Sequence, residues 1–122
     1  MDPSPDLFGL ESEGCTLILT PHRKLDEIGY HQIEPELKGI LHRVEKNVSV
    51  RNLVLDLQQT PYLGSSALGF VLLLWKRISG RQGCLAIVNA SDHTREILKV
   101  TKLELLWTIR ATKEEALATM PE

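Results

Sequence analysis

This sequence has little net charge, no long apolar run and only two cysteines, and each of these features excludes a class of protein. The formal net charge is −2 and the isoelectric point is about 6.1. The chain therefore lacks the basic surplus with which a protein neutralises many phosphates, and we expect no nucleic-acid partner. The longest apolar stretch, Ala67–Trp75 with Gly69 inside it, falls far short of the ~20 residues of a membrane-spanning helix, so we expect no membrane partner.

The start of the chain and its two cysteines indicate a cytoplasmic protein. Residues 1–6 contain no basic residue followed by an apolar run, which a signal peptide would need. Cys15 and Cys84 lie in apolar, strand-like contexts without a disulfide or redox spacing, where a reduced thiol behaves as a small buried hydrophobe. A chain of 122 residues fits one domain. We expect a disordered tail over 1–6, one domain over 7–118 and a C-terminal tail over 119–122.

Strand and helix patterns alternate along the chain and predict an α/β fold. The near-continuous apolar run over 53–57 is typical of a central parallel strand covered on both faces. A polar, glycine-containing turn over 11–14 predicts an N-terminal hairpin. The strands predicted from these patterns cover 7–10, 15–19, 53–57, 84–88 and 105–109. The order predicts a mixed β-sheet of four to five strands with about four helices packed on it.

Apolar residues at helical spacing define the predicted helices. Ile33, Leu37, Ile40, Leu41 and Val44 share one face of the first helix, whose first turn would hold Pro35. The second helix runs from Ser65 or Ser66 to Ile78, and Gly80 and Gly83 stop it. In the third helix, Asp92 is the expected cap, and the apolar positions are Ile97, Leu98 and Val100. Thr112 and Glu115 form a capping box for the last helix.

No catalytic or metal-binding pattern is complete. The four histidines, His22, His31, His42 and His93, lack zinc-ligand spacing, so we expect no metal and no cofactor. Gly64-Ser65-Ser66-Ala67-Leu68 resembles the nucleophile elbow of esterases, but Leu68 replaces its last glycine. The only histidine after Ser66 is His93, beside Asp92. We expect a protein that is not an enzyme, and a small serine hydrolase remains an alternative.

Four segments in one order carry a resemblance to a known family. They are Leu53–Leu57, Gly64-Ser65-Ser66-Ala67-Leu68-Gly69, Gly83–Asn89 and Thr94–Leu103. Together they resemble the signature of STAS domains, the family of anti-sigma factor antagonists. The sequence departs from that signature at Gly64, where the family has aspartate, and at Ala67 and Lys102, where it has glycine.

The resemblance implies a function in protein binding. It implies a cytoplasmic module that docks onto an anti-sigma factor or kinase-like regulatory protein, as a monomer or weak homodimer. A serine whose phosphorylation prevents docking would correspond to Ser65. A helix N-terminus stabilises a phosphate, which makes this a suitable position for such a switch. The alternative within the family is a scaffold or ligand-binding subunit that is not phosphorylated.

The helix after the serine pair has two predicted faces. Its core face would consist of Ala67, Leu68, Val71, Leu74, Trp75 and Ile78, with Leu72 also near the sheet. Its partner-binding stripe would start at the serine pair and run along the helix. The predicted partner-binding residues are Gly64, Ser65, Ser66, Gly69, Phe70, Leu73 and Arg77.

Overall fold

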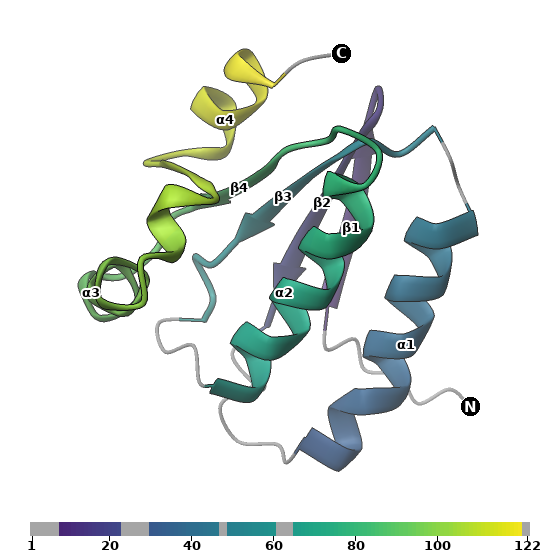
Figure 1. Cartoon of the computed structure of the whole chain (residues 1–122), viewed down its shortest axis with the longest axis horizontal. Helices are drawn as coiled ribbons and strands as arrows, with labels where there is room; N and C mark the ends of the chain where they lie inside the picture. Colours follow the sequence, from purple (N-terminus) through teal and green to yellow (C-terminus); the bar gives the residue numbers. More distant parts are fainter. Residues whose placement is uncertain (1–7, 23–29, 47–48, 61–64, 121–122) are drawn as a thin grey trace.

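A computed structural model of the chain describes residues 8–22, 30–46, 49–60 and 65–120, and it contains a five-stranded mixed sheet (Figure 1). The strands lie in chain order, and their bounds are β1 Phe8–Glu13, β2 Thr16–Pro21, β3 Asn52–Asp56, β4 Leu85–Val88 and β5 Thr108–Arg110. β1 is antiparallel to β2, and every other neighbouring pair is parallel. The predicted α/β fold with a mixed sheet is confirmed. The two expected tails, apart from Thr119 and Met120, lie outside the described residues, as does Leu7.

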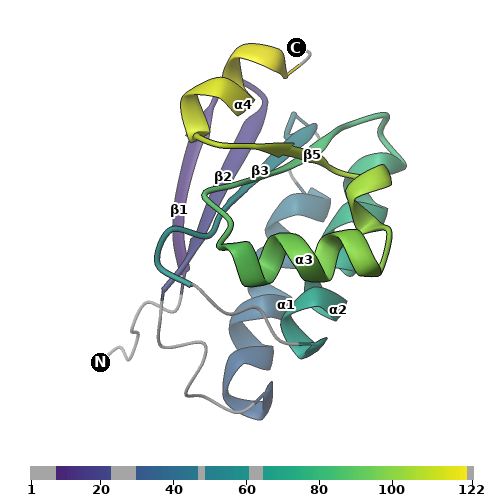
Figure 2. The same ribbon diagram turned by 90° about the vertical axis from the view of Figure 1, so that its left-hand side faces the viewer.

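The helices cover the two faces of the sheet unequally (Figure 2). Their bounds are α1 Tyr30–Lys46, α2 Ser65–Ser79, α3 Asp92–Val100, a short 3-10 helix η2 Leu103–Leu105, and α4 Lys113–Thr119. α1 and α2 lie side by side on one face, and Leu98 of α3 joins the same core. α4 packs against β3, β4 and β5 on the opposite face. The larger core therefore lies between the sheet and α1 to α3.

Alternation along β3 explains why its sequence is almost wholly apolar. Leu53 and Leu55 belong to the core under α1 and α2, whereas Val54 belongs to the cluster that includes Ala116 of α4. Successive side chains of a strand point to opposite faces, so a strand covered on both sides needs apolar residues at every position. The prediction of a central parallel strand over 53–57 is confirmed, with the observed strand at 52–56.

The N-terminal hairpin has longer strands and a tighter turn than the sequence predicted. Glu13 pairs with Thr16, so only Gly14 and Cys15 form the connection. Gly14 has a φ of 60°, a left-handed conformation that glycine adopts without steric cost. Cys15 thus lies in the turn and is half-buried, not in the strand. The polar residues at 11–13 extend β1 because an edge strand with one solvated face tolerates them.

Two helix starts differ from the prediction. α1 begins at Tyr30, which places Pro35 inside the helix and not in its first turn. α3 is capped by Ser91, whose hydroxyl accepts a hydrogen bond from the backbone N–H of Thr94 at 3.2 Å, and Asp92 is its first residue. Serine and aspartate are similarly good caps, so the sequence did not distinguish them. The Thr112 cap of α4 is confirmed, since its hydroxyl accepts from the N–H of Glu115 at 3.2 Å.

The connection from α3 to β5 was predicted wrongly. Residues 105–107 are not a strand, because Lys102 adopts a left-handed conformation with φ 65° and the chain then forms η2. β5 starts only at Thr108. Val100 was expected on the core side of α3 but is 69% exposed, because Thr94 and Leu98 form the buried face. Position 102 is one of the departures from the family signature, so a lysine here takes the conformation that favours glycine.

Candidate functional site

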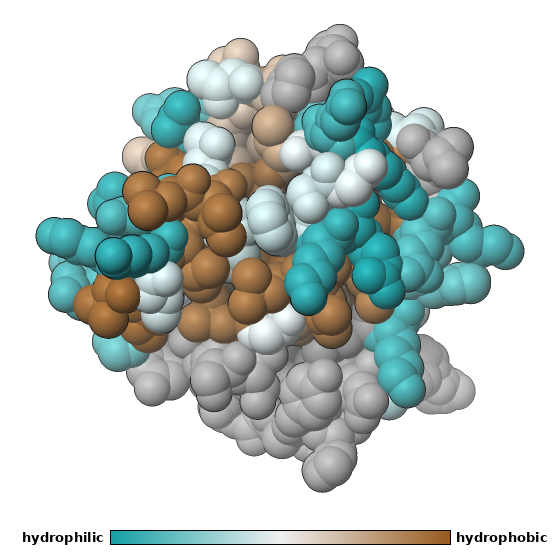
Figure 3. Space-filling model, viewed as in Figure 1, coloured by the Kyte–Doolittle hydropathy of each residue, from teal (hydrophilic) through white to brown (hydrophobic). Residues whose placement is uncertain are grey.

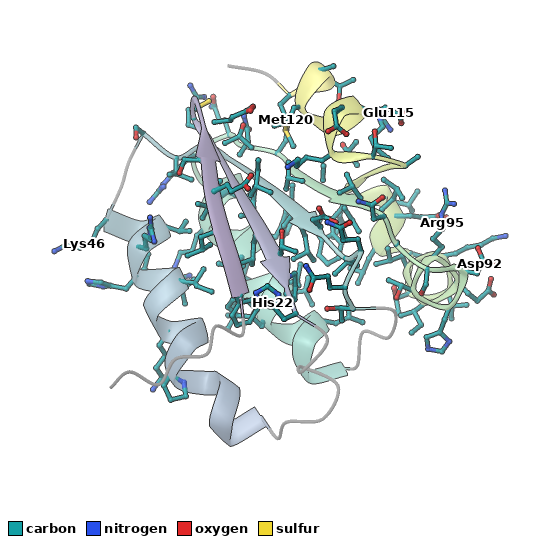
Figure 4. All side chains as sticks on the ribbon, turned by 180° about the vertical axis from the view of Figure 1, so that it is seen from behind. His22, Lys46, Asp92, Arg95, Glu115 and Met120 are labelled. Carbon is teal, nitrogen blue, oxygen red and sulfur yellow. The ribbon has the colours of Figure 1, made fainter. Side chains whose placement is uncertain are left out.

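The carboxyl ends of β2, β3 and β4 meet at one edge of the sheet, and α2 begins beyond that edge. Parallel strands bring the loops that follow them together, and this is where α/β proteins usually place their sites. Figure 4 shows His22, which follows β2, at this edge, and Asp92 and Arg95 of α3, the helix after β4, farther to the right. Three connections thus converge on the region where Ser65 starts α2.

A buried carboxylate ties two of these connections together. Asp56 ends β3 and is only 3% exposed. Its Oδ1 accepts hydrogen bonds from the backbone N–H of Gln58 at 3.1 Å and from Nδ2 of Asn89 at 2.9 Å. Its Oδ2 accepts one from Nε2 of Gln58 at 3.3 Å. Asn89 follows β4 in a left-handed conformation with φ 57°, which asparagine tolerates better than most residues. The turn after β4 is therefore held against the connection after β3.

The end of β2 is fixed to the same connection. The Thr60 hydroxyl donates to the backbone carbonyl of Pro21 at 3.0 Å, and Thr60 is fully buried. Nδ1 of His22 lies 3.2 Å from Oε1 of Gln59. Buried polar groups need such partners, because an unmade bond costs about 1–3 kcal/mol. The segment that leads from β3 to α2 is thus anchored up to Thr60 by neighbours on both sides.

The predicted switch residues lie at the start of α2. The helix begins at Ser65, so Ser65 and Ser66 occupy its first turn, and no acidic residue is present in that turn. Backbone N–H groups in a first helical turn lack intrahelical acceptors and favour an anion. Gly64 lies outside the described residues, and the same holds for the side chains of Ser65 and Ser66. The position of Ser65 therefore fits an anion-accepting role.

The rest of the predicted partner-binding stripe is only partly a surface. Gly69 is exposed, and Leu73 is 40% exposed. Phe70 does not lie on the surface, because its side chain is 5% exposed and its ring contacts that of Phe8 at a centroid distance of 6.1 Å. Arg77 is half-buried and forms an ion pair with Glu45 of α1. Phe70 is therefore removed from the predicted surface, and Arg77 has a role in joining α1 to α2.

The predicted orientation of α2 is confirmed at Val71, Leu74 and Ile78 and at the exposed Leu73, and it is wrong at Phe70. Over residues 68–79 of α2, the buried residues are Phe70, Val71, Leu74 and Ile78. By contrast Leu68, Leu72 and Trp75 are only partly buried. α1 packs beside α2, and its Glu45 pairs with Arg77 of α2. The sequence already shows apolar residues on most sides of α2. A sheet covers only one side of a helix, so some of these residues must lie outside the core.

The described part of the chain contains neither a metal-binding cluster nor a membrane-spanning helix. Among residues 8–22, 30–46, 49–60 and 65–120 there is no group of three or more His, Cys, Asp or Glu side chains that could hold a metal ion. Over the same residues, no helix has both the length and the apolar character needed to cross a membrane. Cys15 and Cys84 are both half-buried, and they form no disulfide with each other.

Comparisons with known proteins agree on one family. The STAS domain family model matches residues 10–116. The STAS-domain containing protein PA14_20770 of Pseudomonas aeruginosa is 34% identical over 83 residues, which are 68% of this chain and 77% of that protein. BtrV of Bordetella bronchiseptica, assigned as an anti-sigma factor antagonist, is 30% identical over 87 residues, 71% of each protein.

A solved structure supports the fold independently. The anti-sigma factor antagonist SpoIIAA of Bacillus, in its unphosphorylated form, superimposes with a TM-score of 0.75 at 22% identity. The match covers 90% of this chain and 92% of SpoIIAA. At this identity the likeness shows the fold alone.

Proposed function

Because the chain belongs to the STAS domain family, we propose that it is a non-catalytic regulatory module that docks onto an anti-sigma factor or a related kinase-like protein. Two proteins that it resembles, BtrV and SpoIIAA, carry the name of anti-sigma factor antagonists. The proposed docking surface, called here the α2 surface, is the start of α2 and its outward residues. It comprises Ser65, Ser66, Gly69, Leu72 and Leu73, with Gly64 before the helix.

The apolar outer side of α2 is the observation that carries this proposal. A helix of a small domain normally presents polar residues to solvent and buries one apolar stripe. In α2 the sheet and α1 cover only part of the circumference, and Leu73 is 40% exposed while Leu72 is half-buried. Figure 3 shows hydrophobic side chains gathered beside α2, on the side toward α3, on the face of the molecule that carries the helices. A partner that covers this side would remove those side chains from water.

Docking through the α2 surface can be tested with paired variants. Leu73→Glu should leave the melting temperature nearly unchanged, because Leu73 makes little core packing and surface substitutions cost about 0.5 kcal/mol or less. The same change should abolish binding to a purified kinase-type anti-sigma factor in a calorimetric titration, because it buries an unpaired charge. Ala118→Glu, an exposed position on α4 across the sheet, is the matched control and should bind normally. Normal binding by Leu73→Glu would place the interface elsewhere.

A folding control tests the orientation of α2. Val71 is 3% exposed and contacts the core, so Val71→Glu should unfold the domain by forcing a carboxylate into an apolar interior. Leu72 was expected nearer the sheet but is half-buried, so Leu72→Glu should fold and should weaken docking. Unfolding of Leu72→Glu in a thermal melt would contradict the observed orientation.

We propose Ser65 as the residue whose phosphorylation would control docking. Its place in the first turn of α2 supports this, because a phosphate there is stabilised by free backbone N–H groups and the helix dipole. SpoIIAA is known in a phosphorylated form. Incubation with the anti-sigma kinase and ATP, followed by peptide mass spectrometry, should place phosphate on Ser65. Phosphate on Ser66 or elsewhere would refute the assignment.

A second possibility is docking without phosphorylation. Two features favour it: the first turn of α2, as the structure describes it, holds no acidic residue, and Gly64 precedes the helix. The chain would then dock without being phosphorylated and would act as a scaffold or ligand-binding subunit. Gly64→Asp restores the carboxylate of the family signature and should increase phosphorylation by the kinase. If Ser65 is unmodified in both forms while binding is normal, the phosphorylation-independent function is correct. Labelling of Ser65 or Ser66 by a serine-directed phosphonate would instead indicate a hydrolase.

A further inference from the structure

Half of the lysine and arginine residues belong to two segments that meet at one end of the domain. Residues 38–53 and 65–84 hold seven of the 14 basic residues but only one of the 16 acidic residues, Glu45. The seven are Lys38, Arg43, Lys46, Arg51, Lys76, Arg77 and Arg81. The net charge of −2 is therefore an average over a strongly basic part and an acidic remainder. The local charge, not the average, decides which partner a surface attracts.

Hydrogen bonds hold the ends of these two segments together. Arg81, in the turn after α2, donates from Nη2 to the carbonyl of Glu45 and from Nη1 to the carbonyl of Val50, both at 2.9 Å. Arg77 of α2 forms an ion pair with the carboxylate of Glu45. The last turns of α1 and α2 therefore lie together, at the end of α2 that is opposite to Ser65 (Figure 1). Figure 3 shows hydrophilic side chains gathered over these last turns.

Four further cations at this end are exposed, and none of them forms an ion pair with another described residue. They are called here the basic end and comprise Arg43, Lys46, Arg51 and Lys76. Figure 4 shows Lys46 pointing away from the domain. The two helix ends do not account for these charges, because each helix C-terminus carries only about half a negative charge. Arg81 already donates to a carbonyl in the last turn of α1. The basic end therefore has a positive charge that the described fold does not use.

The basic end continues the α2 surface. Residues three and four apart share one side of a helix, so Leu73 lies one turn from Lys76 and Arg77. Leu73 and Lys76 are both exposed. A partner that covers Leu73 must therefore face Lys76 and extend toward the last turn of α1. A basic partner face would be repelled there, whereas carboxylates would be attracted.

We propose that the basic end selects a partner protein with an acidic docking face, and that it does so by accelerating association. This inference rests on the proposed docking through the α2 surface and adds the chemistry of the partner, whose aspartate and glutamate side chains meet the basic end when Leu73 is covered. Charges at the rim of an interface mainly change the association rate and its dependence on salt. A nucleic acid presents phosphates but no apolar surface for Leu73. A bilayer is bound through a broad apolar face, whereas Leu73 is the one large apolar side chain exposed on α1 or α2 in the described chain.

Stopped-flow association of the full chain with a purified kinase-type anti-sigma factor tests the role of charge. The association rate of the wild type should fall at least about tenfold between about 0.1 M and about 1 M NaCl, because the screening length falls from about 10 Å to about 3 Å. The double variant Lys46→Glu with Lys76→Glu should associate at least about tenfold more slowly than the wild type at low salt, with little dependence on salt. The matched control is Lys99→Glu with Lys102→Glu, which makes the same charge change at the end of α3 and should associate as the wild type does. Both double variants replace exposed lysines near helix ends, so their melting temperatures should fall by similar, small amounts.

The outcomes separate this inference from the docking proposal on which it rests. If Leu73→Glu abolishes binding while the Lys46→Glu, Lys76→Glu variant associates at the rate of the wild type, docking through the α2 surface stands and the acidic partner face is overturned. If neither change affects binding, both proposals are overturned, because the interface then lies elsewhere. Vesicles of anionic lipid and a nucleic acid duplex are tested in parallel. Wild-type binding to either of them that the double variant loses, with an unchanged rate of docking, would assign the basic end to that ligand and overturn the inference.

Discussion

Gly83→Ala should destabilise the protein severely, because the backbone leaves no room for a side chain at this position. A Cβ atom at Gly83 would lie 1.6 Å from the carbonyl oxygen of Arg51, 2.7 Å from its carbonyl carbon and 3.0 Å from the carbonyl oxygen of Ile78. Ordinary contact begins near 3.4 Å, so the two backbones must separate by about 1.8 Å. No side-chain rotation can relieve this contact, because all the opposing atoms belong to the backbone.

The cost can be estimated from the hydrogen bonds that such a movement would break. The N–H of Arg51 donates to the carbonyl of Cys15 at 2.8 Å, and the N–H of Leu53 donates to the carbonyl of Cys84 at 2.9 Å. The N–H of Gly83 itself donates to Ile78 at the end of α2 at 2.8 Å. Each hydrogen bond lost costs about 1 kcal/mol, and a group left buried without a partner costs more. We therefore expect Gly83→Ala to lower the free energy of unfolding by about 3–5 kcal/mol. That is a large part of a total stability of about 5–15 kcal/mol.

Thermal and urea unfolding followed by circular dichroism will measure this cost. For a chain of 122 residues, this loss of stability corresponds to a fall in melting temperature of about 12–20 °C. Gly80→Ala is the matched control, since a Cβ at Gly80 meets only carbonyl oxygens at 3.6 Å, and its stability should stay within about 0.5 kcal/mol of the wild type. A Gly83→Ala protein that melts within about 2 °C of the wild type would refute the argument.

Three further predictions concern single residues. Lys102→Gly should raise stability by about 0.5–1 kcal/mol in a urea titration, because glycine adopts the φ of 65° without the cost that lysine has; an unchanged midpoint would contradict this. Gly69 and Gly39 are exposed helical sites, and a new Cβ at either would have nothing within 4 Å. Alanine at each site should therefore stabilise the fold by about 0.5–1 kcal/mol. Only Gly69→Ala should weaken docking in a calorimetric titration. Asp56→Ala should cost about 1–3 kcal/mol, because Gln58 and Asn89 lose their acceptor; equal unfolding midpoints would show that the network is not needed.

The sequence predicted the elements that depend on strong periodicity and failed where a rotation or a turn decided the outcome. The run over 53–57 identified β3 because burial on both faces requires an unbroken apolar segment. Phe70 was wrongly placed on the surface because α2 is apolar on several sides, whereas in the fold its ring is buried and contacts that of Phe8 in β1. The spacing of apolar residues in a sequence does not show where a neighbouring helix or strand will pack.

Turns and networks at the strand ends were also beyond sequence reasoning. The left-handed backbone at Lys102 converted an expected strand into η2, and nothing in a lysine indicates that conformation. The contact between Asp56 and Asn89 joins residues far apart in the chain, and it became visible only when the parallel pairing of β3 and β4 was known. By contrast the serine pair was correctly placed at a helix start, because a change from strand period to helix period marks that boundary.

The unequal covering of the sheet has a consequence for synthesis on the ribosome. The strands lie in chain order, so each new strand from β2 onward can join the edge left by the previous one as the chain emerges. The face of the sheet opposite α1 and α2 cannot be covered this early, because in the described chain α4, the last helix, packs on it. Val54, Ile18 and Val88 therefore stay in water until α4 has been released. Nascent chains that stall before Lys113 should be the form that chaperones recognise.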